Sequence, residues 1–142
     1  GVIGGSSAGA TILGSYLARG DSSSNTIMMG DHEEGFGFIR NIAIDQHMLR
    51  RNRQFDLMEI VEAKPGLLGV GLDEDTAIVV RGNRFEVIGQ SYIAIFDYTH
   101  RLDSGGKFYF LEPGDQFDIL QRQAYRPQTT LQPLERVIEQ NW

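Results

Sequence analysis

Hydrophobic residues fall into short runs separated by polar and glycine-rich stretches, a pattern typical of a domain with short helices and strands. Small and apolar residues at 8–18 predict a buried helix that ends at a polar cluster. Residues 21–38 lack periodicity and predict a loop. Apolar residues at every third position from Phe55 to Val61 predict an amphipathic helix with Asn52 as its N-cap.

Runs rich in β-branched and aromatic residues predict the strands, which lie at 41–45, 67–72, 91–97 and within 107–120. Two alternating runs around a Gly-Asn pair predict a hairpin at 76–89. From residue 121 onward, Gln, Arg and Pro accumulate and predict a partly ordered tail with a short helix near its end. Strands and helices alternate in the first half and strands dominate the second, which predicts an α/β domain with an antiparallel extension.

Length and composition narrow the class of protein. A chain of 142 residues that is 41% hydrophobic is long enough for one domain with a core. The net charge of -6 argues against a nucleic-acid partner, because such proteins gather Lys and Arg against phosphates. No apolar run approaches the roughly 20 residues that cross a bilayer, so we expect no membrane partner. The chain has no cysteine, which excludes disulfides, thiolate metal sites and a cysteine nucleophile.

The start of the chain has no initiator methionine. It begins at Gly1, and Val2 and Ile3 are typical of the end of a strand. We therefore expect a cut edge of a longer protein, with any targeting signal upstream of it. The visible chain is expected to be soluble, and the sequence assigns no compartment to it.

The stretch GGSSAGA contains the pattern G-x-S-x-G at Gly5 to Gly9. In a nucleophile elbow this pattern places a serine on a sharp turn between a strand and a helix. Ser7 is then the candidate nucleophile, and the backbone N–H of Ala8 is a candidate donor to the oxyanion. The same residues fit a simple turn that begins a helix, and the pattern alone leaves both interpretations open.

Two phosphate-binding motifs are excluded at the same stretch. A P-loop requires Lys followed by Ser or Thr after its second glycine, whereas Ala10 and Thr11 follow Gly9. A dinucleotide fingerprint requires the spacing G-x-G-x-x-G, which is absent.

A serine nucleophile needs a base, and the chain offers His32, His47 and His100. His47 follows the strand at 41–45, at the carboxyl end where open α/β sheets gather their catalytic groups. The acidic loop around His32 lacks a second histidine at helical spacing, so a metal site at 31–34 is disfavoured. Lone histidines are more often structural than catalytic, and position alone favours His47.

A carboxylate that orients the base is available after the strand at 67–72. Asp73, Glu74 and Asp75 are consecutive there, and each has the chemistry to accept the imidazole N–H. Spacing does not separate these three acids, and on spacing alone a solvated acidic turn is the favoured interpretation.

Three ordered motifs, GGSSAGA, IDQHMLRRNR and GVGLDEDTA, resemble the serine peptidase family of cyanophycinases and aspartyl dipeptidases, most closely its cyanophycinases. The resemblance covers residues 1–98. It implies a Ser-His-Glu triad in which Ser7 is the nucleophile, His47 the general base and acid, and Glu74 the orienting carboxylate. The family's substrate-contacting positions correspond to Asp45, Gln46, Arg51 and Arg53. Where the family pattern has a further arginine, this chain has Asp56.

The resemblance also implies a substrate and a reaction. Family members cleave cyanophycin, a poly-aspartate that carries arginine on its side-chain carboxyls, to β-Asp-Arg dipeptides without a cofactor or metal. Cations suit the carboxylates of such a substrate, and acidic or amide groups suit its guanidinium. Two alternatives stay open: an aspartyl or isoaspartyl dipeptidase, and a non-catalytic ligand-binding module of the same fold.

The implied fold is α/β, a three-layer sheet like that of class I glutamine amidotransferases (flavodoxin-like). On this view the chain is a single partial peptidase domain over 1–142. The elbow and triad would occupy 1–98, and a β-rich extension and tail 99–142. The family also implies a homodimer, with residues 76–119 as the expected interface.

Overall fold

A computed structural model of the chain describes residues 1–100 and 106–127. Within them the chain forms two helices and nine strands. The helices are α1 (Ala8–Thr11) and α2 (Leu57–Ala63). The strands are β1 (Gly14–Tyr16), β2 (Ile39–Asp45), β3 (Leu68–Leu72), β4 (Thr76–Arg81), β5 (Arg84–Gly89), β6 (Ile93–Asp97), β7 (Tyr109–Leu111), β8 (Gln116–Asp118) and β9 (Gln123–Tyr125).

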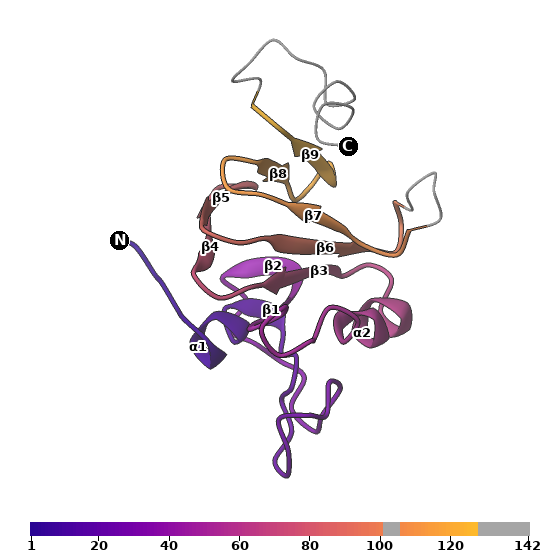
Figure 1. Cartoon of the computed structure of the whole chain (residues 1–142). Helices are drawn as coiled ribbons and strands as arrows, with labels where there is room; N and C mark the ends of the chain where they lie inside the picture. The colour runs from indigo at the N-terminus through magenta and orange to yellow at the C-terminus, as the bar shows by residue number, and fades with distance from the viewer. Residues whose placement is uncertain (101–105, 128–142) are drawn as a thin grey trace.

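The strands form two sheets, which are stacked in Figure 1. The first has the order β1-β2-β3-β6-β7; β1, β2 and β3 are parallel, and β6 and β7 add to it in antiparallel fashion. The second is antiparallel throughout, in the order β4-β5-β8-β9. The molecule is therefore an α/β protein with a mixed sheet and an antiparallel sheet.

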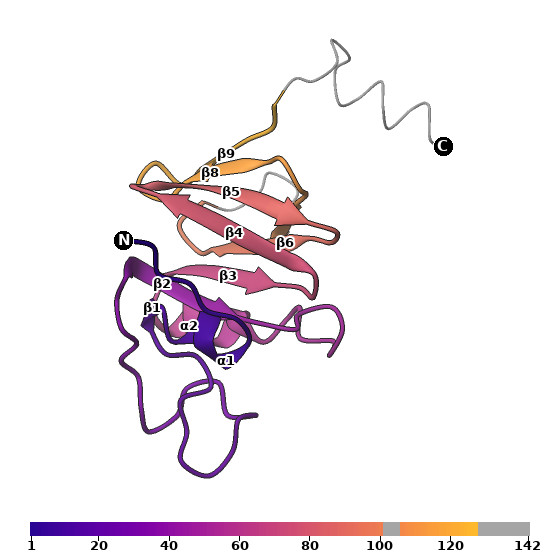
Figure 2. The ribbon, with the colours of Figure 1, turned by 90° about the vertical axis from the view of Figure 1, so that its left-hand side faces the viewer.

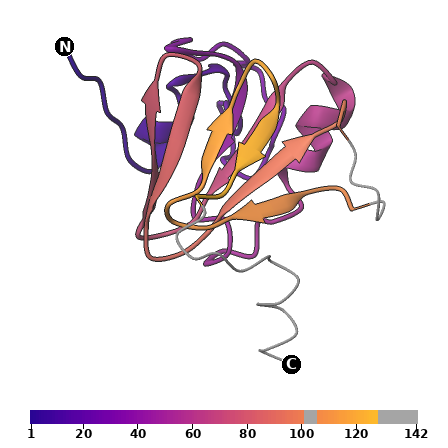
Figure 3. The ribbon, with the colours of Figure 1, turned by 90° about the horizontal axis from the view of Figure 1, so that it is seen from above.

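Side chains alternate across the first sheet and divide the core in two. One face carries the apolar residues Ile42, Ile44, Leu68, Val70, Ile93 and Ile95, which pack with Phe85, Val87 and Phe117 of the second sheet. The other face carries Ala43, Ala94 and Phe96, which pack with Ile60 and Val61 of α2. The layers are thus α2, the mixed sheet and the antiparallel sheet, and α1 and α2 lie at opposite sides of the molecule (Figures 1 and 3).

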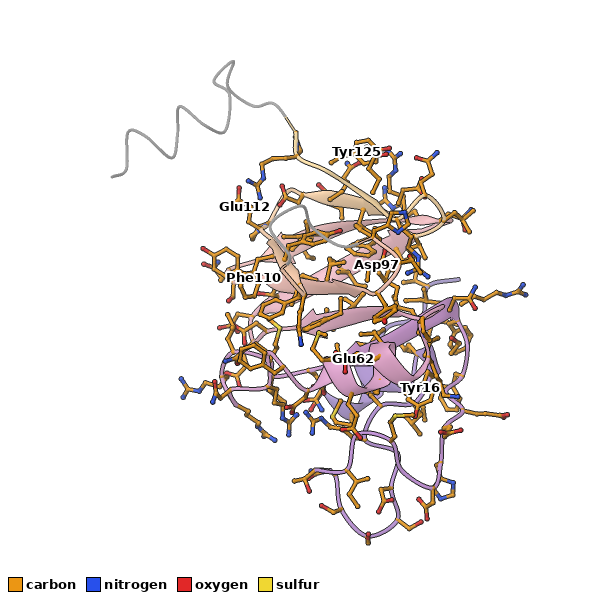
Figure 4. The ribbon with its side chains drawn as sticks, turned by 90° about the vertical axis from the view of Figure 1, so that its right-hand side faces the viewer. Tyr16, Glu62, Asp97, Phe110, Glu112 and Tyr125 are labelled. Carbon is orange, nitrogen blue, oxygen red and sulfur yellow. The ribbon has the colours of Figure 1, made fainter. Side chains whose placement is uncertain are left out.

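The helix α2 is amphipathic, which confirms the prediction, but it begins later than predicted. Its N-cap is Asp56 rather than Asn52, and Phe55 precedes the helix and is 63% exposed. Leu57, Ile60 and Val61 form its buried face. In Figure 4, Glu62 on the outer side of α2 and Asp97 at the end of β6 lie on the same side of the sheet.

The helix predicted at 8–18 is wrong beyond Thr11. Residues 14–16 instead form β1, which pairs in parallel with β2. The Ser15 hydroxyl donates to the Ile42 carbonyl and accepts from the Ile42 N–H. A Cβ at Gly14 would lie 2.8 Å from that carbonyl oxygen, so glycine is required where the two strands approach.

Three further predictions have different outcomes. The hairpin of β4 and β5 around Gly82 and Asn83 is confirmed. The single strand predicted within 107–120 is instead two strands, β7 and β8, separated by a turn in which Gly114 has a φ of 95°. Val2 and Ile3 form no strand, since no described segment pairs with them.

The tail prediction is only partly covered. Residues 123–125 form β9, and the helix predicted near the end of the tail lies outside the described residues. In the part of the chain that is described, no helix has the length and apolar character required to cross a membrane.

Candidate active site

Ser7 lies on a sharp turn immediately before α1. Its φ of 53° and ψ of -127° place a non-glycine residue in a sparsely populated backbone region, at a cost of about 1–3 kcal/mol. The turn is held by backbone hydrogen bonds, from the Gly9 N–H to the Ser6 carbonyl and from the Ala10 N–H to the Ser7 carbonyl. The N–H of Ala8 donates to no other group within residues 1–100 and 106–127. A strained and exposed serine of this kind is typical of a nucleophile elbow.

The two glycines that flank the serine have different surroundings. A Cβ at Gly5 would run into the backbone carbonyl of Gly9. A Cβ at Gly9 would meet no atom of the described residues within 4 Å. The close approach of the chain across the turn therefore requires glycine at position 5 and not at position 9.

His47 lies on the turn that follows β2, and its φ of 54° makes it a second strained residue at this site. The Met48 N–H donates to the Leu72 carbonyl, so the turn is attached to the end of β3. Parallel pairing of β2 and β3 places their carboxyl ends at one edge of the sheet. The turns after these two strands are therefore adjacent, and they carry His47 and Glu74.

The structure brings together the three residues predicted as a triad. Ser7 Oγ lies 3.1 Å from His47 Nε2, and His47 Nδ1 lies 3.0 Å from Glu74 Oε1. With the proton on Nδ1, the imidazole donates to Glu74 and accepts from the hydroxyl of Ser7. The side chains of His47 and Glu74 are 24% and 43% exposed, so the pair remains accessible to solvent.

The three side chains line a cavity of about 790 Å³ between the N-terminal segment, the ends of β2 and β3, and the β4 strand. Figure 2 views the molecule from this side, where the N-terminal segment runs to α1 below β4. Much of the remaining wall is apolar and includes Leu13, Phe38, Ile44, Leu72 and Ile78. The cavity is large enough for a peptide segment to reach Ser7.

The four predicted substrate contacts differ in position. Gln46 lines the cavity, and its Oε1 is buried without a hydrogen-bond partner among the described residues. Arg51 is exposed and is not among the residues that line the cavity. Arg53 lies behind the wall, with its side chain 10% exposed, and donates to the Gln46 carbonyl. Burial and the nearby charge of Arg19 lower the pKa of Arg53.

Asp45 points away from the cavity, because alternation along β2 directs Ile44 to the cavity and Asp45 to the α2 side. Its carboxylate is 1% exposed and accepts two hydrogen bonds from Arg19, at 2.7 and 2.8 Å. Arg19 also donates to Asp56 at 2.6 Å. Burial acts to lower the pKa of Arg19, but the hydrogen bonds that it donates to both carboxylates raise the pKa above its ordinary value. A direct contact of Asp45 with substrate stays a prediction.

Two residues near the triad were not assigned roles from the sequence. Arg50 Nε lies 4.0 Å from Glu74 Oε2, on a side chain that is 75% exposed. Asp73 Oδ1 accepts the backbone N–H groups of Leu49 and Arg50, and its Oδ2 accepts the hydroxyl of Ser91. The sequence marked Asp73 only as one of three adjacent acids, since partners in other segments leave no local signal.

The other two histidines lie elsewhere. His32 Nε2 is 3.3 Å from Ser22 Oγ in the loop after β1. His100 Nδ1 is 3.1 Å from Asp97 Oδ2, at the end of β6. Neither residue is among those that line the cavity, so His47 is the histidine adjacent to Ser7.

Comparison with known proteins places these motifs in a family. The family described as "Peptidase family S51" matches residues 1–88. A cyanophycinase of Trichormus variabilis is 32% identical over 137 residues, covering 84% of this chain and 46% of that protein. A cyanophycinase of Geminocystis herdmanii is 38% identical over 98 residues, covering 67% of this chain and 36% of that protein.

The chain spans about half or less of the length of these curated relatives, with coverages of 46% and 36%. The family match includes the stretches that carry Ser7, His47 and Glu74. From this match and these relatives, the chain belongs to peptidase family S51, as a cyanophycinase-like member.

Proposed function

We propose that this chain carries the catalytic triad of a serine-type exopeptidase that hydrolyses cyanophycin to β-Asp-Arg dipeptides. The observation that carries the proposal is the continuous contact from the Ser7 hydroxyl through the His47 imidazole to the Glu74 carboxylate. The strained backbone of Ser7 and the adjoining cavity support it. In this proposal Ser7 is the nucleophile, His47 is the general base and Glu74 is the carboxylate that orients it.

In the first half of the reaction, Ser7 Oγ attacks the scissile carbonyl carbon while His47 Nε2 takes the hydroxyl proton. Glu74 stabilises the imidazolium that forms and stays ionised. The Ala8 N–H donates to the oxyanion of the tetrahedral intermediate. Collapse of this intermediate breaks the C–N bond, and His47 returns the proton to the leaving amine.

In the second half, a water molecule attacks the acyl ester on Ser7. His47 Nε2 takes a proton from that water and then gives it to Ser7 Oγ as the ester C–O bond breaks. The products are a carboxylic acid and the free enzyme, so the net reaction consumes one water for each peptide bond. This acid and base chemistry uses only the chain's own residues.

The choice of substrate rests on the relatives and on one feature of the cavity. The curated relatives named above are cyanophycinases. Gln46 Oε1, buried without a partner, is suited to accept a guanidinium N–H of a substrate arginine. We infer that Gln46 is the substrate contact of first importance. Arg51 is exposed and does not line the cavity, so its contact with a substrate carboxylate stays a prediction.

The remaining expectations concern the whole natural protein. We propose an amidotransferase-like fold for it, in which the parallel strands β1, β2 and β3 belong to the central sheet. We also propose that residues 1–142 are part of a single peptidase domain and that the whole protein forms a homodimer.

The test is the substitution Ser7→Ala in the whole natural polypeptide in which this chain occurs. Release of β-Asp-Arg from insoluble cyanophycin is expected to fall by a factor of about 10³ or more, because the nucleophile is lost. Ser6→Ala is the matched control, since it removes the adjacent hydroxyl and is expected to retain release. Undiminished release by Ser7→Ala contradicts the proposal.

Parallel assays separate the alternatives. Cleavage of Asp-X or isoaspartyl dipeptides without cleavage of cyanophycin indicates a dipeptidase. A fluorophosphonate probe is expected to label Ser7 in the wild-type protein and to leave Ser7→Ala unlabelled. A wild-type protein that resists the probe and cleaves neither substrate indicates a non-catalytic ligand-binding module.

A further inference from the structure

One carboxylate connects the two turns that carry His47 and Glu74. Asp73 Oδ1 lies 3.0 Å from the backbone nitrogen of Leu49 and 3.2 Å from that of Arg50, in the turn after β2. Its Oδ2 accepts the hydroxyl of Ser91 at 2.6 Å. Asp73 directly precedes Glu74 on the turn after β3. Its side chain therefore connects that turn to the turn after β2, which carries His47.

The turn of His47 needs such a connection. Its φ of 54° is unfavourable for a residue with a side chain, so contacts from outside the turn must maintain it. The bond from the Met48 N–H to the Leu72 carbonyl supplies one contact, and Asp73 supplies two more at the following residues. A single anion thus binds two successive N–H groups of a strained turn.

The hydrogen bonds also favour the charged form of Asp73. Burial acts to raise the pKa of its carboxyl, but the bonds from Ser91 and from the backbone N–H groups outweigh burial and hold the pKa below its ordinary value. Hydrogen bonds to an ionised acceptor are roughly twice as strong as neutral ones. The Asp73 carboxylate is therefore ionised at neutral pH, where its hydrogen bonds to the turn are strongest.

We propose that Asp73 is a positioning residue, which holds the His47 imidazole at hydrogen-bond distance from both Glu74 and Ser7. This inference rests on the proposed function, in which those three side chains transfer a proton. Asp73 does not touch the reacting atoms in this role. Without it, the turn after β2 can relax toward an ordinary backbone conformation, and the contact between the imidazole and Glu74 is lost for part of the time.

The experiment compares Asp73→Ala with Asp73→Asn in the whole natural polypeptide. The alanine variant removes every acceptor, whereas asparagine keeps one oxygen for the N–H groups of Leu49 and Arg50. We expect the rate of fluorophosphonate labelling at Ser7 to fall by a factor of about 10–100 in Asp73→Ala, because a small displacement of a catalytic side chain slows the reaction by this order. In Asp73→Asn the rate is expected to stay within about fivefold of wild type, because a neutral acceptor is weaker but still present.

A matched control exists in the second sheet. Asp118 Oδ1 also accepts two successive backbone N–H groups, those of Leu120 and Gln121, at 3.0 and 2.9 Å. It does not line the cavity of the triad. Asp118→Ala therefore removes a carboxylate of the same kind and is expected to leave the labelling rate unchanged, even if it lowers the melting temperature.

A second readout does not depend on activity. Nitrogen-15 NMR of the imidazole, assigned by its loss in His47→Asn, reports which ring nitrogen carries the proton at a pH where the ring is neutral. The wild-type protein is expected to hold the proton on Nδ1, facing Glu74, and Asp73→Ala to shift toward the mixture found for free histidine. Asp118→Ala is expected to match wild type.

The outcomes separate this inference from the proposed function. A folded Asp73→Ala that keeps both the wild-type labelling rate and the Nδ1 proton overturns the positioning role. If Asp73→Ala does not fold, Asp73→Ser replaces it, since its single, shorter-reaching oxygen cannot serve both partners. If wild type is neither labelled nor active, the proposed function fails, and the NMR comparison alone decides whether Asp73 positions His47.

Discussion

Two clusters of polar side chains lie beside the end of β2, and they differ in burial and in completeness. On the α2 side, Arg19 and Asp45 form a bidentate ion pair whose side chains are 7% and 1% exposed. On the cavity side, Ser7, His47 and Glu74 form a chain of two contacts that stays open to solvent. The end of β2 thus supports two clusters on opposite faces. We call Arg19, Asp45 and Asp56 the closed cluster, and Ser7, His47 and Glu74 the open cluster.

The difference separates stability from chemistry. In the closed cluster every charge has a fixed partner, so removing one partner leaves a buried charge without compensation. In the open cluster the hydroxyl of Ser7 is exposed and, within the described part of the chain, contacts the His47 imidazole alone, so it is free to react. We therefore expect substitutions in the open cluster to abolish activity with little effect on folding, and those in the closed cluster to do the reverse.

The largest expected effect is on activity, from His47→Asn. Asparagine adopts the left-handed backbone conformation readily, so the turn after β2 is kept while the base is lost. Hydrolysis is expected to fall by a factor of about 10⁴ or more, the usual cost of removing a triad member. The measurement is kcat/KM on cyanophycin, together with the urea midpoint of unfolding, which is expected to change little. Hydrolysis within tenfold of wild type would count against the assigned base.

The next effect is on folding, from Arg19→Ala. It leaves the Asp45 carboxylate buried, with Arg53 Nη1 at 4.0 Å as the remaining cation within salt-bridge range among the described residues. We expect the free energy of unfolding to fall by about 3–5 kcal/mol, as for other broken buried pairs. The control is Arg84→Ala, which breaks a 3.8 Å contact to Asp118 on a half-exposed side chain and should cost about 1 kcal/mol or less. Equal losses in urea unfolding for both variants would remove the distinction between the clusters.

A smaller effect depends on pH and comes from Asp73, which touches the turn of the open cluster. Because its pKa is lowered in the folded state, the folded protein binds this proton less readily than the unfolded chain does. The stabilisation is therefore present above the ordinary aspartate value of about 3.9 and is lost as the pH falls through the lower folded value. Asp73→Asn should unfold about 1 kcal/mol more easily than wild type near neutral pH, by loss of charge-assisted hydrogen bonds. If the difference between the urea midpoints of wild type and Asp73→Asn is the same at pH 3 as at neutral pH, the predicted pH dependence is wrong.

The smallest effect is expected from Asp56→Asn, at the outer edge of the closed cluster. Asp56 is 37% exposed and contacts Arg19 through one oxygen, whereas Asp45 contacts it through two. Solvent weakens such a contact, so the loss in unfolding free energy should be about 1 kcal/mol or less. A loss in urea unfolding as large as that of Arg19→Ala would show that the cluster acts as one unit.

Local pattern predicted the elements whose partners are nearby in sequence. The β4 and β5 hairpin and the amphipathic α2 follow from alternation and turn residues within a few positions. The helix predicted through residue 18 failed because β1 forms only by pairing with β2, more than twenty residues later. Residues 12–16 mix aliphatic, small and aromatic side chains that fit either element, and the distant strand decides.

The candidate site was predicted unevenly for the same reason. The pattern made Ser7 a candidate without deciding between an elbow and a simple turn, and position favoured His47. Glu74 was separated from Asp73 and Asp75 only by family resemblance. Arg19 had no local signal, since its partners Asp45 and Asp56 lie 26 and 37 residues away in the chain. The backbone conformation at His47 was equally hidden, because tertiary contacts impose it.

The unequal crowding at the two glycines of the serine turn has an evolutionary consequence. The backbone at Gly5 leaves no room for even a methyl group, whereas Gly9 faces open space. A library randomised at both codons and selected for activity should therefore retain one amino acid at the first position and a spectrum of small ones at the second. Distant homologues that have lost the second glycine would still be able to build this turn, and searches that demand both would overlook them.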